Sequence, residues 1–168
     1  MALLADDPVG ALSSSISVRR VTANDEPFLL KLFGTTREEF RFLDNTQLDA
    51  LIRMQFMLQH QQYRNGYPNG EDQLIVHNGE PIGRIFIDEA EAELTLVDIA
   101  LLPEYRNRGI GRLLLDQVLA RAMSAGKGVR LHVLNSNPAR RLYERQGFTE
   151  TGRDSMYIEM RNDSGRKA

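Results

Sequence analysis

A loop rich in glycine and arginine is the part of this sequence whose residue types and spacing fit a chemical role. Residues 100–111 read ALLPEYRNRGIG, with an apolar β-rich run before the loop and a helical apolar pattern directly after it. Gly109 and Gly111 let backbone N–H groups approach a ligand closely. The start of a helix adds unpaired N–H donors and a partial positive charge. The segment therefore predicts an anion cradle, most naturally for phosphate.

Arginines also stand at the starts of two predicted helices, where a cation opposes the helix dipole. Arg112 begins the helix after the loop, and Arg140 and Arg141 begin a later one. Such a position costs about 0.3–1 kcal/mol, which a bound anion would offset. The alternative is that these side chains are solvated or paired with Glu104 or Glu144. For Arg140 and Arg141 both interpretations stay open.

The two common nucleotide-binding loops do not match this segment. No Gly-Lys-Ser/Thr sequence follows as in a P-loop, and Leu114 stands where the dinucleotide fingerprint has its third glycine. The phosphate ligand must therefore be held by a different kind of loop.

The elements that must position the loop follow from local patterns. Alternation predicts a strand at residues 16–21, and a helix follows a cap at Asn24 or Asp25. A second cap at residues 44–46 starts a long helix that ends at residues 67–70. Asn78-Gly79 predicts a hairpin between strands 73–77 and 81–87, and further strands are expected at 93–102 and 129–134. The helix after residue 111 should end at Gly126, and a later helix should be capped by Asn137, begin with Pro138 and close at Gly147. One or two final strands are expected in residues 148–160.

These elements indicate one α/β (α+β) domain. The chain has 168 residues, and a domain usually takes about 150. We expect a loose leader at residues 1–15, the domain at 16–160 and a polar, frayed tail at 161–168.

Composition narrows the function classes. The net charge of −2 argues against a dedicated nucleic-acid binder, and no apolar run approaches a membrane span. The chain has no cysteine, which excludes thiolate zinc sites and fits a reducing cytoplasm. The three histidines, His60, His77 and His132, are scattered, so we expect no metal.

Two motifs resemble one family. Arg106-x-x-Gly109-x-Gly111 resembles the pyrophosphate loop Q/R-x-x-G-x-G/A of the GCN5-related N-acetyltransferases (GNAT). Residues 137–148, NPARRLYERQGF, resemble that family's later N-x-A-x-x-L-Y-x-x-x-G-F helix, and residues 16–29 resemble its first strand and helix. The resemblance covers about residues 16–160.

The resemblance implies a GNAT-like fold: a splayed, mostly antiparallel mixed sheet flanked by helices on both faces. Acetyl-CoA would lie in the notch between the strands that end near Leu102 and Leu134. Backbone groups of Leu101 and Leu102 would hold its pantetheine arm. The other implied coenzyme-binding residues are Arg106, Asn107, Arg108, Gly109, Ile110, Gly111, Arg112, Asn137 (with Asn135 and Ser136 as alternatives), Arg140 and Tyr143.

Three residues are candidates for proton transfer. Tyr143 matches the family tyrosine, and a phenol pKa near ~10 suits protonation of a leaving thiolate; the alternative is a core aromatic. His132, with an ordinary pKa near ~6.5, is the first candidate for the base, and an ordinary strand histidine is the alternative. Asp98 is the second candidate because it interrupts an apolar strand, where burial would raise its pKa; a structural hydrogen-bonding role is its alternative.

The resemblance implies transfer of an acetyl group from acetyl-CoA to a primary amine by direct attack. The acceptor would be a small molecule or a protein amine, flanked by residues 35–46 and 152–155. Phe40, Phe42, Tyr63 and Tyr67 either line that pocket or pack helices together. Homodimers are common in the family. Two alternatives remain: a non-catalytic acyl-CoA-binding or sensing module, and another phosphate-binding α/β domain.

Overall fold

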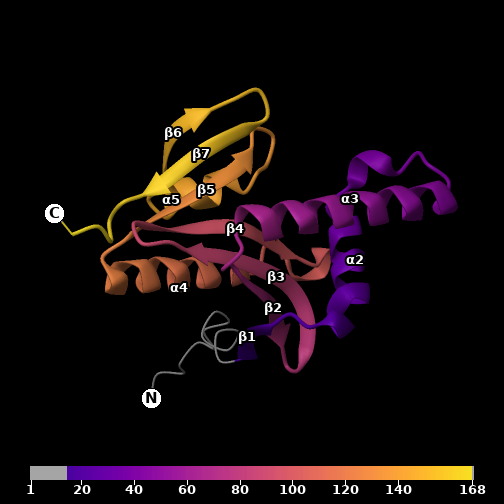
Figure 1. Cartoon of the computed structure of the whole chain (residues 1–168), viewed down its shortest axis with the longest axis horizontal. Coiled ribbons are helices and arrows are strands. Elements are labelled where there is room, and N and C mark those ends of the chain that lie inside the picture. The colour runs from indigo at the N-terminus through magenta and orange to yellow at the C-terminus, as the bar shows by residue number, and fades with distance from the viewer. Residues whose placement is uncertain (1–14, 168) are drawn as a thin grey trace, which may run out of the picture.

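A single seven-stranded sheet organises residues 15–167, which are the residues described by the computed structural model (Figure 1). Its order is β1-β2-β3-β4-β5-β7-β6, and neighbours are antiparallel except β4 and β5, which are parallel. The strands are β1 (Ile16–Arg20), β2 (Glu71–His77), β3 (Glu80–Glu89), β4 (Glu93–Leu101), β5 (Gly128–Leu134), β6 (Thr149–Arg153) and β7 (Tyr157–Asn162). The helices are α2 (Glu26–Gly34), α3 (Asn45–Gly66), α4 (Ile110–Ala125) and α5 (Arg140–Arg145), with short 3-10 helices η1 (Ala23–Asp25), η2 (Glu38–Phe40) and η3 (Pro103–Tyr105).

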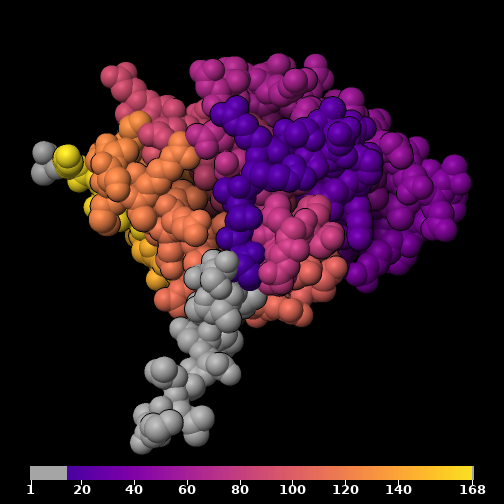
Figure 2. Space-filling model, turned by 90° about the horizontal axis from the view of Figure 1, so that it is seen from below, coloured from indigo at the N-terminus to yellow at the C-terminus, as the bar shows by residue number. Residues whose placement is uncertain are grey.

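Helices cover both faces of the sheet, as predicted. Successive strand residues point to opposite faces, and in β2 Ile75 joins the apolar cluster of α4 and α5, whereas Leu74 joins that of α2 and α3. Seen from below, the indigo N-terminal elements lie between the orange α4 and the purple α3 (Figure 2). Neighbouring residues of β2 therefore pack on opposite faces of the sheet, one toward α4 and α5 and the other toward α2 and α3.

The sheet splits between β4 and β5. These strands pair only from Glu93 to Leu96 with Gly128 to Leu131. In the pairing of β3 with β4, Phe86 faces Asp98 while Ile87 faces Leu96, so Val97 is an extra residue. Such a bulge bends its strand and changes the direction of the side chains beyond it. The predicted notch therefore opens from Val97 onward.

Local signals place several element boundaries as predicted. The Asp44 carboxylate accepts a hydrogen bond from the Gln47 N–H at 2.9 Å and begins α3. Asn78 and Gly79 have φ values of 49° and 84°, as a tight hairpin turn requires. Gly126 ends α4 with a φ of 68°. No helix within residues 15–167 is long and apolar enough to cross a membrane.

Several strands begin or end one or two residues from the predicted positions, and the last helix and the tail differ in ways that depend on specific contacts. The last helix begins at Arg140, not at Pro138; Asn137 instead closes the preceding turn by accepting from the Ala139 N–H at 2.9 Å. The expected frayed tail is wrong for Arg161 and Asn162, which belong to β7. Asn162 is buried and donates to the Gln146 carbonyl, a partner that only the fold brings near. Most of the predicted leader, residues 1–14, lies outside the described residues.

Candidate active site

The loop before α4 has the backbone that an anion cradle needs. Asn107 and Gly109 both have positive φ values, 58° and 82°, and Gly109 is the N-cap of α4. A Cβ atom at Gly109 would meet nothing within 4 Å. The space beside Gly109, at the start of α4, is therefore open. A phosphate could approach the first N–H groups of the helix there.

Arg106 holds this loop in place. Its Nε donates to the Leu101 carbonyl at 2.9 Å, and its Nη2 donates to the Thr35 hydroxyl at 3.1 Å. The Leu102 N–H donates to the Ile82 carbonyl at 2.8 Å. Arg106 thus ties the end of β4 to the end of α2. The Leu101 carbonyl and the Leu102 N–H, two groups expected to hold pantetheine, are already bonded within the chain.

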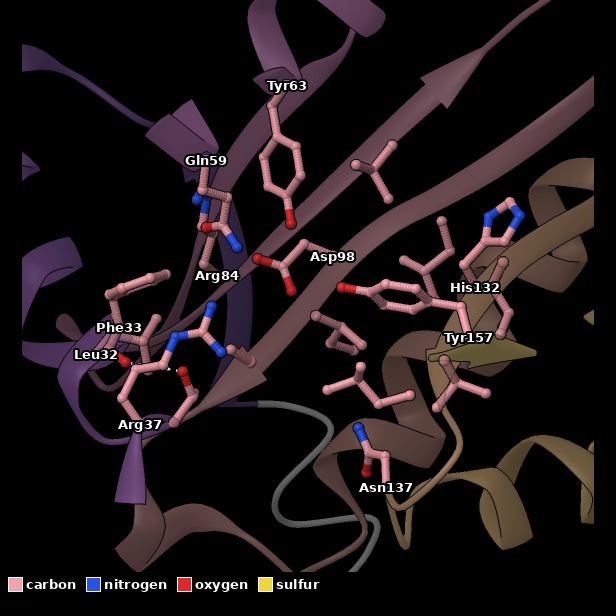
Figure 3. Close-up of a pocket in the computed structure, with 18 of the residues that line it drawn as sticks. Leu32, Phe33, Arg37, Gln59, Tyr63, Arg84, Asp98, His132, Asn137 and Tyr157 are labelled. Atoms are coloured by element: carbon pink, nitrogen blue, oxygen red, sulfur yellow. Dashed lines mark hydrogen bonds between the residues drawn. The ribbon is translucent and has the colours of Figure 1, made fainter. Parts of the chain in front are cut away.

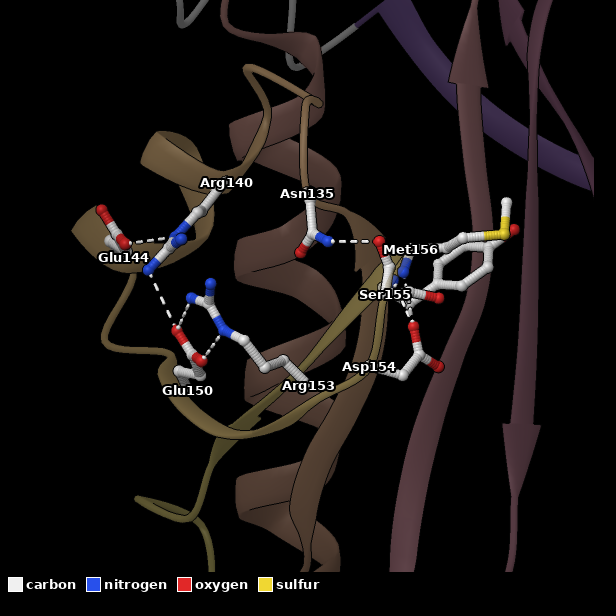
Figure 4. A network of polar contacts seen from close by, with 9 residues as sticks. Asn135, Arg140, Glu144, Glu150, Arg153, Asp154, Ser155 and Met156 are labelled. Carbon is white, nitrogen blue, oxygen red and sulfur yellow. Dashed lines mark hydrogen bonds and ion pairs between the residues drawn. The ribbon is translucent and has the colours of Figure 1, made fainter.

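The arginines at the helix starts divide into two cases. The Arg112 side chain is 70% exposed and lies 4.0 Å from Asp116. The Arg140 guanidinium donates to Glu144 at 2.8 Å and to Glu150 at 3.1 Å (Figure 4). Glu150 is also held by Arg153, which lowers the pKa of its carboxyl. The contacts of Arg140 favour the ion-pair alternative, while Arg112 keeps an exposed charge beside the loop.

A cavity of about 290 Å³ lies where β4 and β5 separate (Figure 3). Its lining includes all three proton-transfer candidates, Tyr143, His132 and Asp98, together with Asn137 and Tyr63. Residues 106–112 do not line it, but α4 touches α5 next to Tyr143. There a Cβ at Gly111 would lie 3.6 Å from the Leu142 side chain. The fold thus brings the cradle and the cavity to neighbouring positions.

Tyr143 reaches the cavity from the α4 side of the sheet. The side chain is buried, and its ring meets Phe148 edge to face with centroids 5.9 Å apart. Burial, and secondly the charge of Asp98, raise the pKa of Tyr143 to about 12. The phenol therefore stays protonated at neutral pH. A protonated phenol can donate a hydrogen bond to a developing thiolate and so stabilise its charge before the proton moves.

Asp98 faces the cavity from the α3 side. Burial raises the pKa of its carboxyl, and the nearby Arg84 opposes the shift. Arg84 is itself buried and donates two hydrogen bonds to Asp72, at 2.7 and 2.8 Å. Sequence reasoning missed Arg84, although the alternation of β3 places it on the same face as Phe86, which packs against Tyr63 of α3.

His132 lies on the same sheet face but farther from the centre of the cavity. Its side chain is 45% exposed, and its Nε2 lies 3.4 Å from the Glu159 carboxylate. The Tyr157 ring stands between His132 and Asp98, with its hydroxyl toward Asp98 (Figure 3). These contacts favour the alternative of a partnered strand histidine.

Tyr157 is a second cavity residue that sequence reasoning missed. The loop before it is fixed because Asp154 accepts from the Tyr157 N–H at 2.7 Å, and Asn135 Nδ2 donates to the Ser155 carbonyl at 3.1 Å (Figure 4). In β7 Ile158 points to the α4 side, so its neighbour Tyr157 points to the cavity side. The alternation of apolar residues along this strand could have identified Tyr157 from the sequence. Of the four aromatic residues expected near the acceptor, Tyr63 lines the cavity, whereas Phe42 is 95% exposed.

The described residues hold no group of three metal-ligating side chains. Within residues 15–167, His, Asp and Glu do not gather in threes around a point that would suit a metal ion.

Known proteins are similar to this chain in sequence. Residues 70–150 match the model of the acetyltransferase (GNAT) domain. The [ribosomal protein bS18]-alanine N-acetyltransferase of Haemophilus influenzae is 38% identical over 77 residues, which make up 45% of this chain and 53% of that protein. The chain thus matches about half the length of this curated relative.

Solved structures agree over a larger share of the chain. The PaiA N-acetyltransferase of Thermoplasma acidophilum, in complex with coenzyme A, has a TM-score of 0.67 at 20% identity and covers 88% of this chain and 98% of its own. Naa50 of Arabidopsis thaliana, in complex with a bisubstrate analogue, has a TM-score of 0.61 at 21% identity, with coverage of 88% and 98%. At such identities the likeness establishes the fold.

The split sheet with helices on both faces is the acetyl-CoA N-acyltransferase fold. Residues 70–150, which contain the loop and the late helix, match the GNAT domain model, so the resemblance of these two motifs to that family is confirmed.

Proposed function

We propose that this chain is an N-acetyltransferase that moves an acetyl group from acetyl-CoA to a primary amine by direct attack. The observation that carries the proposal is the position of Tyr143. It is buried at the separation of β4 and β5, lines a cavity with Asp98, and follows Leu142, which adjoins the start of α4. A hydrogen-bond donor there suits a departing sulfur better than a purely packed ring.

Backbone groups of the loop would hold the coenzyme. Its pyrophosphate would take the N–H groups around Gly109 and Gly111, with Arg108 and Arg112 adding positive charge. Asn137 lines the cavity beside Tyr143 and would face the pantetheine end. We assign Arg106 to positioning the loop, because its donors are engaged by Leu101 and Thr35.

The reaction forms a C–N bond, breaks the thioester C–S bond, and moves one proton from nitrogen to sulfur. In our proposal Tyr143 gives the sulfur its proton. Asp98 is our preferred group for accepting the amine proton, because it faces the cavity directly, and His132 is the second candidate. The cysteine-free chain fits a cytoplasmic location.

The acceptor class is a small-molecule or protein amine. Two similar proteins support a protein amine: one is named for the alanine of a ribosomal protein, and the other was solved with the analogue CoA-Ac-MVNAL. These two acceptors are those of the similar proteins, and for this chain we propose the acceptor class alone.

An acceptor screen tests the proposal. Release of free thiol from acetyl-CoA would be followed with free amino acids, polyamines and short peptides. We expect turnover with at least one amine and formation of its acetamide. Tight acetyl-CoA binding with no turnover across the panel would favour a non-catalytic acyl-CoA-binding module, while nucleotide binding without acetyl-CoA binding would favour another phosphate-binding domain.

A further inference from the structure

Arg37 is a cavity residue whose guanidinium makes no ion pair with a carboxylate of residues 15–167. It follows α2 and lines the cavity, and its guanidinium carbon lies 4.5 Å from the centroid of the Phe33 ring. Its Nε is buried and makes no hydrogen bond with any of residues 15–167. Figure 3 shows the guanidinium turned inward, toward Asp98. A buried donor of this kind is costly unless a ligand satisfies it.

The other arginines near the cavity are already engaged. Arg84 is neutralised by its paired hydrogen bonds to Asp72. Arg106 donates to the Leu101 carbonyl and the Thr35 hydroxyl. Among the described residues, Arg37 is therefore the cavity arginine whose charged guanidinium is not paired with a carboxylate.

Arg37 and Asp98 together present opposite charges to one space. The charge of Arg37 acts on the carboxyl of Asp98 and on the Tyr63 hydroxyl, so all three lie within electrostatic reach of one another. No ion pair joins Arg37 to Asp98 in residues 15–167. The space between them thus keeps both an anionic and a cationic partner available.

We propose that the acceptor carries a carboxylate beside its amine and that Arg37 binds this carboxylate. The inference rests on the proposed function and narrows its acceptor to an amine that is also an acid. Asp98 would face the amine while the planar guanidinium takes the carboxylate oxygens. Such an acceptor gives the Arg37 guanidinium the carboxylate partner that it lacks among residues 15–167. Arg37 is thus assigned as a specificity residue.

This chemistry has two sources, a free amino acid and a peptide with an acidic second residue. Matched pairs distinguish them. The first arm compares amino acids with their amides, and the second compares Ala-Glu-amide with Ala-Gln-amide. Steady-state KM and kcat are measured for wild type, Arg37→Gln, and Arg41→Gln as the control. Arg41 lies in the same segment, is 70% exposed and pairs with Glu38.

We expect wild type to prefer the carboxylate member in one arm. Arg37→Gln should raise KM for that acceptor by about tenfold to 100-fold, the usual loss for a charged hydrogen bond. KM for the amide member and for acetyl-CoA should stay within about twofold, and Arg41→Gln should match wild type. Equal turnover of both members in both arms, or equal losses for both members in Arg37→Gln, would overturn the inference while leaving the acetyltransferase proposal intact.

A binding measurement decides the inference even if no acceptor turns over. Coenzyme-A-loaded protein is titrated calorimetrically with four N-acetyl compounds: N-acetylglycine, N-acetylglycinamide, N-acetyl-Ala-Glu-amide and N-acetyl-Ala-Gln-amide. We expect an acidic compound to bind at least tenfold more tightly than its neutral match, and Arg37→Gln to remove that difference. Equal binding of acidic and neutral compounds, or no binding of any, would contradict the inference. Failure of the proposed function would appear separately, as absent turnover with intact coenzyme A binding.

Discussion

Tyr143 and Asp98 face one cavity from opposite sides of the split sheet, and the charge of Asp98 adds to burial in raising the pKa of the Tyr143 phenol to about 12. Tyr143 comes from α5 on the α4 side, and Asp98 comes from β4 on the α3 side. In our proposal, the donor for the leaving sulfur and the acceptor for the amine proton thus meet where the strands separate. The first two predictions depend on this pair.

Tyr143→Phe should lower kcat by about 100-fold, because the leaving thiolate loses its donor. Since the ring and its packing on Phe148 remain, the dissociation constant for acetyl-CoA should change by less than about threefold. Steady-state kinetics and calorimetry measure the two quantities. Tyr67→Phe is the matched control, because that ring packs against Phe86 and does not line the cavity. An unchanged kcat in Tyr143→Phe would remove the proposed role.

The pH–rate profile should distinguish Asp98 from His132. A base must be ionised, and burial raises the pKa of Asp98, so activity should rise with pH through a limb above the ordinary carboxylate range. Asp98→Asn should abolish that limb and lower kcat by about 100-fold. His132→Ala should keep it. If His132→Ala removes the limb and Asp98→Asn does not, His132 is the base.

Arg112 and Arg140 should differ in their effect on acetyl-CoA affinity. Arg112 is exposed next to the loop, so Arg112→Gln should weaken binding by about threefold to tenfold. Arg140→Gln should leave the dissociation constant within about twofold, because Glu144 and Glu150 already bind its guanidinium. Calorimetric titration at two salt concentrations measures both. Equal losses in the two variants would show that Arg140 also meets the coenzyme.

Asp72→Asn should destabilise the fold, because it leaves the charge of Arg84 buried without its carboxylate. The Arg84 side chain is only 4% exposed, and breaking such a pair costs about 3 kcal/mol or more. Urea unfolding gives the change in free energy. Glu38→Gln is the control, since its pair with Arg41 is exposed on both sides and should contribute under about 1 kcal/mol. Similar losses in both variants would contradict a structural role for the buried pair.

Features with local causes could be predicted from the sequence. The cap at Asp44, the hairpin at Asn78-Gly79 and the end of α4 at Gly126 each depend on a few neighbouring residues. The mostly antiparallel sheet with helices on both faces followed from a family resemblance carried by two short motifs. The start of the last helix was misplaced because Asn137 closes a turn there before the helix begins.

Features that depend on strand register could not be read in the same way. Glu150, the partner of Arg140, lies on β6, and Asp72, the partner of Arg84, lies on β2, the strand next to β3. The position of Asp98 depends on a one-residue bulge at Val97 that shifts every side chain after it. Sequence reasoning therefore named Asp98 and Tyr143 but missed Arg84 and Tyr157, which line the same cavity.

Calorimetric titration with acetyl-CoA tests the central claim most directly. Wild type should bind with micromolar affinity, and Gly109→Trp should lose that binding because its side chain fills the open space at the loop. Gly126→Ala is the control: it strains a second left-handed glycine, at the other end of α4, and should bind as wild type does. Absence of binding by wild type, or equal binding by Gly109→Trp, would contradict a coenzyme site at this loop.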